Sequence, residues 1–481
     1  MNRARSWLAL SALVLINACS GGSSSSSEAP PPPPPTEVPT SATEVPTTAP
    51  AAVVSSIVTR APSPATGCPA IDPGAAALPG TVHNNSIQGP ETLDLAGSPH
   101  RFPDGLNVSS TLTVEPCALV LVATGQAIWM NGDATLVAVG DAQHPIRFDS
   151  IDPEATRGSW SGIYLTESAT PRSRLAFVTV EDAGGSAGFV EPAAIHVTGD
   201  YGVAMNEITI RRSGGHGISM RGLARFAAGS AAIHVIESGN AEIGAGLVSF
   251  ADASRVGTLP DLTFEGADGP EIVVVGDQSS TVGITQTWRN PGAGVRYHVR
   301  VDLTVEGATG PILTIAPGTT LAFDAGKGFY VGMGADGALV LDGHAEETRI
   351  VLTSARSVQS PADWVGLTFG EHSLASACRV AWTTISFTGA ESGWANPHGC
   401  GQEGAAHFAI QVREHPIAAI EHLTVTSLGE NAAAIQRGYI SDQPADYTAA
   451  ALGNDLASGN CAQTLVGGAN GCPDPVPACA R

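Results

Sequence analysis

The residues best suited to acid–base chemistry lie in and around one glycine-rich string, Ser213-Gly-Gly-His216-Gly-Ile-Ser219. Histidine can take up or release a proton near neutral pH. The carboxylate pair Glu181-Asp182 lies upstream of the string, and the pair Arg211-Arg212 directly precedes it. Hydrolysis of a glycosidic bond needs two positioned carboxyl groups, one as acid and one as base or nucleophile. His216, Asp182 and Arg211 are therefore the weak catalytic candidates of this chain.

The string is similar to the Gly-His-Gly segment of polygalacturonases, in which the histidine works beside aspartates from an Asn-Thr-Asp and an Asp-Asp motif, with an Arg-Ile-Lys downstream. None of these partners occurs here at a workable position. A lyase would instead need carboxylates for Ca²⁺ and a basic side chain, for which Asp182, Asp200, Arg211 and Arg212 are the candidates. The other interpretation, which the missing partners favour, is an exposed His216 in a glycine-rich corner.

A second candidate region is the string Ser392-Gly-Trp-Ala-Asn-Pro-His-Gly-Cys400. Trp394 can stack on a sugar ring or anchor a protein contact, and His398 lies beside it, so both are ligand-binding candidates. Trp394 can equally cover the end of an apolar core. The chain has no phosphate-binding loop, no His-Glu-x-x-His and no calcium-binding repeat, so we expect no metal site and no cofactor, with Ca²⁺ only for a lyase.

These residues sit among short apolar runs of four to seven residues that begin after about residue 68. Examples are Ala118–Val122, Ile146–Phe148 and Leu175–Val180, and Gly, Asp, Ser or Pro separates the runs. No sustained helical periodicity is present. Short apolar runs between turn residues predict strands, and the irregular spacing does not suit a series of tight hairpins.

The strand-rich body repeats itself, with an offset that grows from 201 to 215 residues along the chain. A growing offset is expected when loops gain residues while strands keep their order, and six matches in register indicate an internal duplication. The matched segments are Leu112–Pro116 with Leu313–Pro317, Ala134–Val137 with Gly337–Val340, Ile146–Ser150 with Ile350–Ser354, Trp160–Ile163 with Trp364–Leu367, Arg174–Val180 with Arg379–Ile385, and Ile208–Ile210 with Leu423–Val425.

Each copy resembles the right-handed parallel β-helix repeat proteins of bacteria, which have the pectin-lyase-like fold. The phrases that carry the resemblance are Leu313-Thr-Ile-Ala-Pro-Gly318, Gly337-Ala-Leu339, Ile350-Val-Leu-Thr-Ser354 and Trp364-Val-Gly-Leu367. It covers roughly 90–450 and implies an all-β solenoid of two duplicated halves, with short parallel strands stacked in coils. These motifs identify a fold and no activity. An array of β-sandwiches is the alternative architecture.

The N-terminus has the features of an export signal. Arg3 and Arg5 precede an apolar stretch that is short for a membrane span, and Ile16-Asn17-Ala18-Cys19 resembles the lipobox of bacterial lipoproteins, which makes Cys19 the lipidation site. Ser- and Pro-rich sequence follows and predicts a disordered tether. The predicted segments are a signal peptide 1–18, the tether 19–66, a first copy with N-terminal cap 67–260, a second copy 261–440, and a C-terminal cap or tail 441–481.

Cysteines other than Cys19 are expected to form disulfides, because an exported protein can oxidise them. Their spacings predict three pairs, with Cys479 competing for a place in the third and one thiol left over. The pairs are Cys68 with Cys117, Cys378 with Cys400, and Cys461 with Cys472.

The net charge of the chain excludes one class of binding partner. The formal net charge is −22, which excludes nucleic acid as a partner because phosphate contacts need clustered Lys and Arg. We expect a monomer, lipid-anchored in the bacterial outer membrane and facing the periplasm or the cell surface. The leading hypothesis is non-catalytic binding of a polysaccharide or a surface protein. The alternatives are a polysaccharide lyase or glycoside hydrolase of this fold, and a structural spacer in a surface assembly.

Overall fold

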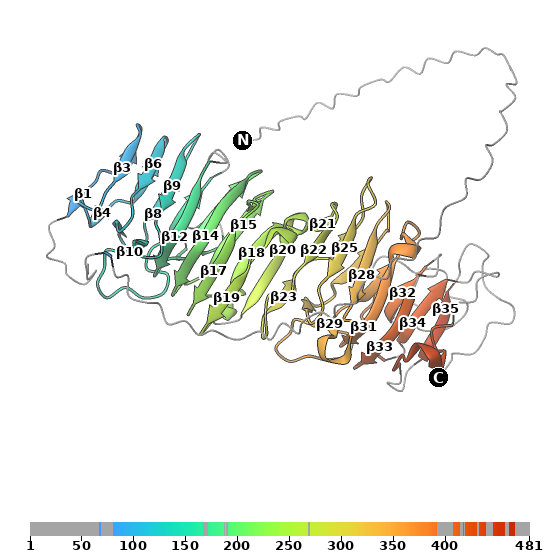
Figure 1. Cartoon of the computed structure of the whole chain (residues 1–481). Helices are drawn as coiled ribbons and strands as arrows, with labels where there is room; N and C mark the ends of the chain where they lie inside the picture. The colour runs from blue at the N-terminus through green and yellow to red at the C-terminus, as the bar shows by residue number, and fades with distance from the viewer. Residues whose placement is uncertain are drawn as a thin grey trace, which may run out of the picture. The chain divides into compact units, whose positions relative to one another are not determined.

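The computed structural model describes residues 67–68, 80–166, 172–186, 188, 191–267, 270–391, 407–413, 417, 419–430, 432–438, 446–456 and 461–466. All of them belong to one compact unit, Pro62–Arg481. This unit consists of short strands that follow one another from β1 to β35, with a few single turns of 3-10 helix (Figure 1). The 3-10 helices are η1 (Ala241–Ile243), η2 (Ala253–Thr258), η3 (Glu346–Thr348), η4 (Ala375–Ala377) and η5 (Ala450–Leu452).

The strands form three sheets. The first sheet contains β1 (Thr81–Val82), β3 (Glu91–Leu93), β4 (His100–Phe102), β6 (Thr111–Val114), β7 (Leu119–Val122), β9 (Thr135–Val139), β10 (Ile146–Ser150), β12 (Arg174–Glu181), β14 (Gly202–Arg211), β16 (Arg225–Phe226), β17 (Ala231–Ile236) and β19 (Leu262–Glu265). The second sheet contains β2 (Ser86–Ile87), β5 (Leu106–Val108), β8 (Ala127–Met130), β11 (Gly162–Leu165), β13 (Ala193–Gly199), β15 (His216–Gly222), β18 (Val248–Asp252), β20 (Glu271–Ser279), β22 (Gln286–Trp288), β23 (Arg296–Val299), β25 (Ile312–Ile315), β26 (Thr320–Phe323), β28 (Ala338–Asp342), β29 (Ile350–Ser354), β31 (Arg379–Ser386) and β33 (Ala419–Thr426). The third sheet contains β21 (Thr281–Val282), β24 (Leu303–Val305), β27 (Gly328–Val331), β30 (Gly366–Phe369), β32 (Phe408–Val412), β34 (Ala433–Gly438) and β35 (Cys461–Val466).

Neighbouring strands in these sheets are parallel and come from successive coils of the chain. β8 pairs with β11, and β11 pairs with β13, while β9 and β10 lie between β8 and β11 in the sequence. Parallel neighbours need a crossover connection, and here the crossover is made of strands on the other faces. The prediction of an all-β parallel β-helix solenoid is confirmed, and the β-sandwich alternative is wrong because sandwiches are built from antiparallel pairs.

The core consists of aliphatic ladders that run from coil to coil. Ile128, Ile163, Ile195, Ile218 and Val248 are register partners along the second sheet, and each is at most 1% exposed. Side chains alternate between the two faces of a strand, so every second residue points into the coil and stacks on its counterpart about 4.8 Å away. Burial of each such side chain contributes about 1.5–3 kcal/mol.

Two faces of the coil share single long strands that bend at one residue. The N-terminal part of β12 pairs with β9 and its C-terminal part pairs with β10. Phe177, between the two parts, has a φ of 51°, and Glu207 in β14 has a φ of 52° at the equivalent place. A left-handed conformation costs an L-residue roughly 1–2 kcal/mol. The bend therefore persists because the ladders on both sides of it hold the chain there.

The internal duplication is visible in the packing of two tryptophans. The indole Nε1 of Trp160 donates to the carbonyl of Glu181 at 2.7 Å, and that of Trp364 donates to the carbonyl of Ser386 at 2.8 Å. Both rings are fully buried. The donor and the acceptor are thus equivalent residues of the two copies, at the offsets that the sequence matches predict.

The second copy is displaced by one face of the coil relative to the first. β10 belongs to the first sheet, whereas its duplicate β29 belongs to the second; β11 belongs to the second sheet, whereas its duplicate β30 belongs to the third. Equivalent outward-facing residues of the two copies therefore lie on different faces. Each ladder of the first copy is continued in the second copy by strands that are not its duplicates.

Candidate ligand-binding face

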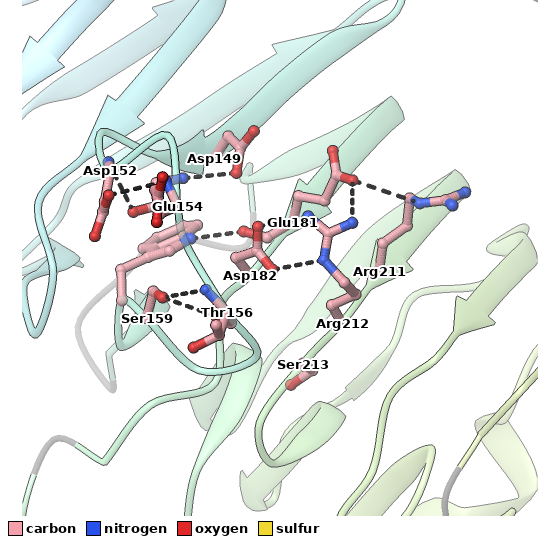
Figure 2. A network of polar contacts seen from close by, with 12 residues as sticks. Asp149, Asp152, Glu154, Thr156, Ser159, Glu181, Asp182, Arg211, Arg212 and Ser213 are labelled. Carbon is pink, nitrogen blue, oxygen red and sulfur yellow. Dashed lines mark hydrogen bonds and ion pairs between the residues drawn. The ribbon is translucent and has the colours of Figure 1, made fainter. Parts of the chain in front are cut away.

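Six charged side chains gather on the outer surface of the first sheet, where β10, β12 and β14 lie next to one another (Figure 2). The register pairs Phe148 with Val180 and Glu181 with Arg211, so the residues at the ends of these strands are neighbours. We call them the charged cluster. Its members are Arg147, Asp149, Glu181, Asp182, Arg211 and Arg212.

The ion pairs of the charged cluster link three coils. Arg212 donates to both carboxylate oxygens of Asp182, from Nε at 2.7 Å and from Nη2 at 2.6 Å. Arg147 Nη2 lies 2.6 Å from Asp149 Oδ2 and 2.8 Å from Glu181 Oε2. The hydrogen bonds with Asp182 raise the pKa of Arg212. Two parallel charge-assisted bonds make the Asp182–Arg212 contact the strongest of the cluster.

The charged cluster is layered. The three carboxylate side chains are 3–10% exposed, whereas the three guanidinium side chains are 28–37% exposed. A molecule that approaches this face therefore meets nitrogen donors, with the compensating carboxylates beneath them.

Asp149 is a buried carboxyl group of the charged cluster, with a side chain that is 5% exposed. Desolvation raises the pKa of its carboxyl to about 6, although Arg147 and the backbone N–H of Ser150 act in the opposite direction. Because the pKa in the folded protein lies above the ordinary value of 3.8, this group favours folding most below that value, and the contribution is lost as the pH rises through about 6.

The Asp149→Asn variant should remove this pH dependence. We expect the melting temperature of the wild type to fall between about pH 4 and about pH 6, and that of the variant to fall less over the same window. Thermal unfolding followed by circular dichroism at several pH values measures both. Identical pH profiles of the two proteins would contradict the assignment.

Arg211 is the arginine of the charged cluster that has unpaired terminal nitrogens among the described residues. Its only ion pair joins Nε to Glu181 Oε1 at 3.5 Å, and neither terminal nitrogen has a partner among the described residues. Figure 2 shows these nitrogens pointing away from the other five side chains. A guanidinium group with two free terminal donors can bind an oxygen-rich ligand in a fixed orientation.

The second copy shows that the fold does not require these charges. Its hydroxyl groups bond one another instead, with Ser386 Oγ donating to Thr353 Oγ1 at 2.9 Å. The coil geometry is therefore kept without a single charged residue at these positions. The counterparts of Arg147, Asp149, Glu181, Asp182, Arg211 and Arg212 are Val351, Thr353, Ser386, Phe387, Thr426 and Ser427.

His216 differs from the expectation of an exposed corner residue, because its side chain is only 1% exposed. Its Nδ1 accepts from the backbone N–H of Gly246 at 2.9 Å, and its Nε2 lies 3.3 Å from Glu191 Oε2. The hydrogen bond to His216 lowers the pKa of Glu191. The glycines beside His216 serve close packing: a Cβ on Gly215 would lie 2.1 Å from the carbonyl oxygen of Pro192.

The structure does not join the three weak catalytic candidates into one site. The side chain of Asp182 is tied to Arg212, that of Arg211 contacts Glu181, and that of His216 pairs with Glu191. Within the described ranges no side-chain hydrogen bond or ion pair joins the candidates, although the backbone N–H of Asp182 donates to the carbonyl of Arg211 at 3.1 Å. Asp200 pairs with Arg225 at 2.8 Å. Neither a glycosidase dyad nor a lyase site is thus assembled from these residues.

The cysteine predictions have mixed outcomes. The Cys68–Cys117 disulfide is present. The predicted Cys378–Cys400 disulfide is wrong, because Cys378 is a free thiol that lies fully buried in the apolar core next to η4, where burial raises its pKa to about 11. Cys461 is disulfide-bonded to a cysteine outside the described residues.

Other predicted residues also lie outside the described residues. They are Cys19, Trp394, His398, Cys400, Cys472 and Cys479.

Sequence reasoning missed a histidine held between two carboxylates on the second sheet. His298 Nδ1 lies 2.7 Å from Glu271 Oε2, and its Nε2 lies 2.7 Å from Asp324 Oδ1. Burial opposes protonation, but the hydrogen bonds to Asp324 and Glu271 outweigh it and raise the pKa of His298. The three residues come from successive coils and lie 27 and 26 residues apart, so no local motif marks them in the sequence.

His298 should stabilise the protein most while it is protonated. Its contribution is fully present below about pH 6.5, the ordinary histidine pKa, and is lost as the pH rises through the raised value. We expect His298→Gln to reduce stability at about pH 6 and to matter less at about pH 9, as measured by thermal unfolding. His234→Gln is the control, since that side chain is 36% exposed. An effect of His298→Gln that does not change with pH would contradict this.

Sequence reasoning also missed an aromatic stack on the outer surface of the second sheet. The ring of Tyr164 lies 4.0 Å from that of Trp129 and 4.1 Å from that of His196, centroid to centroid. The three residues are register partners on β8, β11 and β13. Both faces of the Tyr164 ring are covered by its two neighbours, and the stack supports the sheet.

Three further findings concern metal sites, membrane-spanning helices and similarity to known proteins. Within the described residues, no group of three or more His, Cys, Asp or Glu side chains is arranged to hold a metal ion. No helix in the same part of the chain has the length and apolar character to cross a membrane. Comparisons with protein-family profiles, with curated proteins and with solved structures found no match.

Proposed function

We propose that the protein is a membrane-anchored envelope lipoprotein whose β-helix body, of the pectin-lyase-like kind, binds a polysaccharide or a surface protein without cleaving it. The observation that carries this proposal is the contrast between the two copies. The first copy has six charged residues at positions where the second copy keeps the same coil geometry with neutral ones. Charges that the fold does not need are best explained by a ligand.

Binding without turnover is supported by the state of the acid–base groups. The carboxylates of the charged cluster are buried and paired with arginines, and His216 is enclosed. A general acid or base has to reach the reacting oxygen within hydrogen-bond distance. The exposed groups of this face are guanidinium donors, which bind and orient but do not exchange protons at neutral pH.

The anchor is proposed from the sequence around Cys19. Acylation of its thiol would hold the body at the outer membrane through two or more buried chains. Replacement of Cys19 by Ser should abolish incorporation of labelled palmitate and release the protein from the membrane fraction. Unchanged labelling of this variant would contradict the anchor.

Binding is tested with insoluble plant and bacterial polysaccharides in sedimentation assays. We expect the wild type to sediment with at least one of them and Arg211→Gln to do so about tenfold more weakly, because two oriented donors are lost. Arg225→Gln is the matched control, since Arg225 is also half-exposed and ion-paired but lies outside the charged cluster. Equal binding by all three proteins would rule out this face, and no binding to any polymer would favour a protein ligand or the spacer role.

A further inference from the structure

The displacement between the two copies leaves an open seam in the solenoid. β19 is the last strand of the main path of the first sheet, and β22 is the last strand of the path of the second. The two strands belong to consecutive coils, because β20 and β23, which follow them, pair directly. In a regular coil they would lie about 4.8 Å apart and share a ladder. Here they do not pair, and we call the space between them the seam.

Unused backbone groups face the seam from both sides. The carbonyls of Asp261 and Glu265 accept from β17, so the alternate residues Leu262 and Phe264 direct their N–H and C=O groups toward β22. Trp288 accepts from β25, so Thr287 directs its groups toward β19. None of these three residues has a backbone partner across the seam within the described part of the chain. Free strand edges recruit a further strand.

Apolar side chains at the seam are only partly covered. Leu262 and Phe264 occupy inward positions, yet both are half-buried, unlike the fully buried inward residues of β17. Ile284, before β22, is 45% exposed. It borders a cavity of about 450 Å³ formed by η2 and the start of β22, whose lining residues include Thr258, Thr285 and Thr287. An added strand would bury these side chains.

The edges of the seam are held in place before any partner arrives. The backbone N–H of Gly257 in η2 donates to Gln286 Oε1 at 2.7 Å, and Gln286 Nε2 donates to the carbonyl of Ala253 at 3.1 Å. A register shift in β18 and β20, between Phe250 and Asp252, lies on the same coils. A rigid strand edge lowers the conformational entropy that the protein loses when a partner binds.

The charges around the seam indicate the sign of the charge that a partner would carry there. Glu237 and Glu265 are adjacent, since the N–H of Glu237 donates to the carbonyl of Glu265 at 2.7 Å, and neither carboxylate has a cationic partner within the described residues. Arg289, directly after β22, pairs with Asp261, directly before β19, so this ion pair crosses the seam and Arg289 is not free for a partner. A basic residue at the end of an incoming strand would neutralise the two glutamates.

We propose that the seam binds an extended peptide segment of a protein partner as an added β-strand, with alternate apolar side chains against Leu262 and Phe264 and a basic residue at Glu237 and Glu265. Such β-augmentation takes affinity from the backbone bonds and specificity from the alternating side chains. The seam is separate from the charged cluster, and its occupation does not depend on polysaccharide binding.

The test uses the full-length protein and the synthetic peptide Lys-Thr-Val-Thr-Val-Thr-Val-Lys. We expect saturable binding and slower hydrogen exchange confined to 261–266 and 284–290. The same peptide with alternate backbone nitrogens methylated should bind about tenfold more weakly, since it cannot complete the ladder. This comparison leaves the protein unchanged, so misfolding of a variant cannot imitate the result.

Variants of the protein provide the second arm. Leu262→Asp should weaken binding about tenfold by placing a charge against the apolar side chains of the peptide. Val358→Asp is the control, because Val358 is 80% exposed and lies outside the seam. Equal binding of the methylated peptide, or protection elsewhere in the chain, would overturn the proposal. Protection of the seam that grows with protein concentration and without peptide would instead assign it to a second copy of this chain.

Discussion

Loss of the Cys68–Cys117 disulfide will lower the free energy of unfolding by about 4 kcal/mol, the value expected from chain entropy for a loop of 49 residues. The bond connects residues ahead of the first strand with the turn between β6 and β7. In a solenoid each coil is stabilised mainly by its neighbours, so the loss should fall on the first coils. Chemical denaturation of the wild type and of the Cys68→Ser, Cys117→Ser double variant, without reductant, measures it.

A matched variant separates the disulfide from the backbone at Cys117. This residue has a φ of 66°, and its counterpart in the second copy is Gly318, with a φ of 75°. Glycine adopts this conformation at no steric cost. The Cys68→Ser, Cys117→Gly protein should therefore be about 1 kcal/mol more stable than the double serine variant. A double serine variant as stable as the wild type would show that the bond does not constrain the unfolded chain.

Asp182→Asn should be the most damaging neutral substitution in the charged cluster. Asparagine keeps the shape and tolerates the φ of 56° at this position, so the change removes little besides the charge. Removal of one partner of a buried pair costs about 3–5 kcal/mol. Because Arg212 is 36% exposed and water can reach it, we expect about 2–3 kcal/mol, measured by chemical denaturation.

Asp149→Asn is the control for Asp182→Asn. Asp149 is equally buried, but it makes one hydrogen bond to Arg147, whereas Asp182 makes two to Arg212; each arginine also has Glu181 as a partner. At neutral pH its neutralisation should cost less than about 1 kcal/mol, because burial raises the pKa of Asp149 to about 6 and so disfavours the ionised carboxylate. Equal effects of the two substitutions would mean that burial, and not the bidentate pair with Arg212, decides the stability of this face.

Most of the fold could be predicted from the sequence because strands and duplication leave local signals. The run Arg174–Val180 and its match Arg379–Ile385 are β12 and β31, each bent at one residue. The displacement by one face could not be predicted, since an offset in the sequence counts residues and carries no information about which face a strand occupies. The displacement arises at β20, which pairs with β18 on one side and with β23 on the other.

The site was only partly predictable. Asp182 and Arg211 can be predicted because each belongs to a pair of adjacent charged residues near the Gly-His-Gly string, whereas Arg147 and Asp149 belong to an ordinary strand pattern. The glycines around His216 predict an exposed corner, and this prediction is wrong because the side chain is 1% exposed. In this protein they allow backbones to approach closely: a Cβ on Gly217 would lie 2.6 Å from the carbonyl oxygen of Leu247. Cys378 was misassigned because spacing alone does not show which way a thiol points.

The most direct test of the proposed function measures cleavage and binding in the same tubes. The full-length protein is incubated with plant and bacterial polysaccharides, with and without Ca²⁺, while new reducing ends, unsaturated uronate absorbance and sedimented protein are followed. We expect protein bound to polymer and no product above the blank. Product formation that is abolished by His216→Gln, in a variant that still folds, would contradict the account and make this body an enzyme.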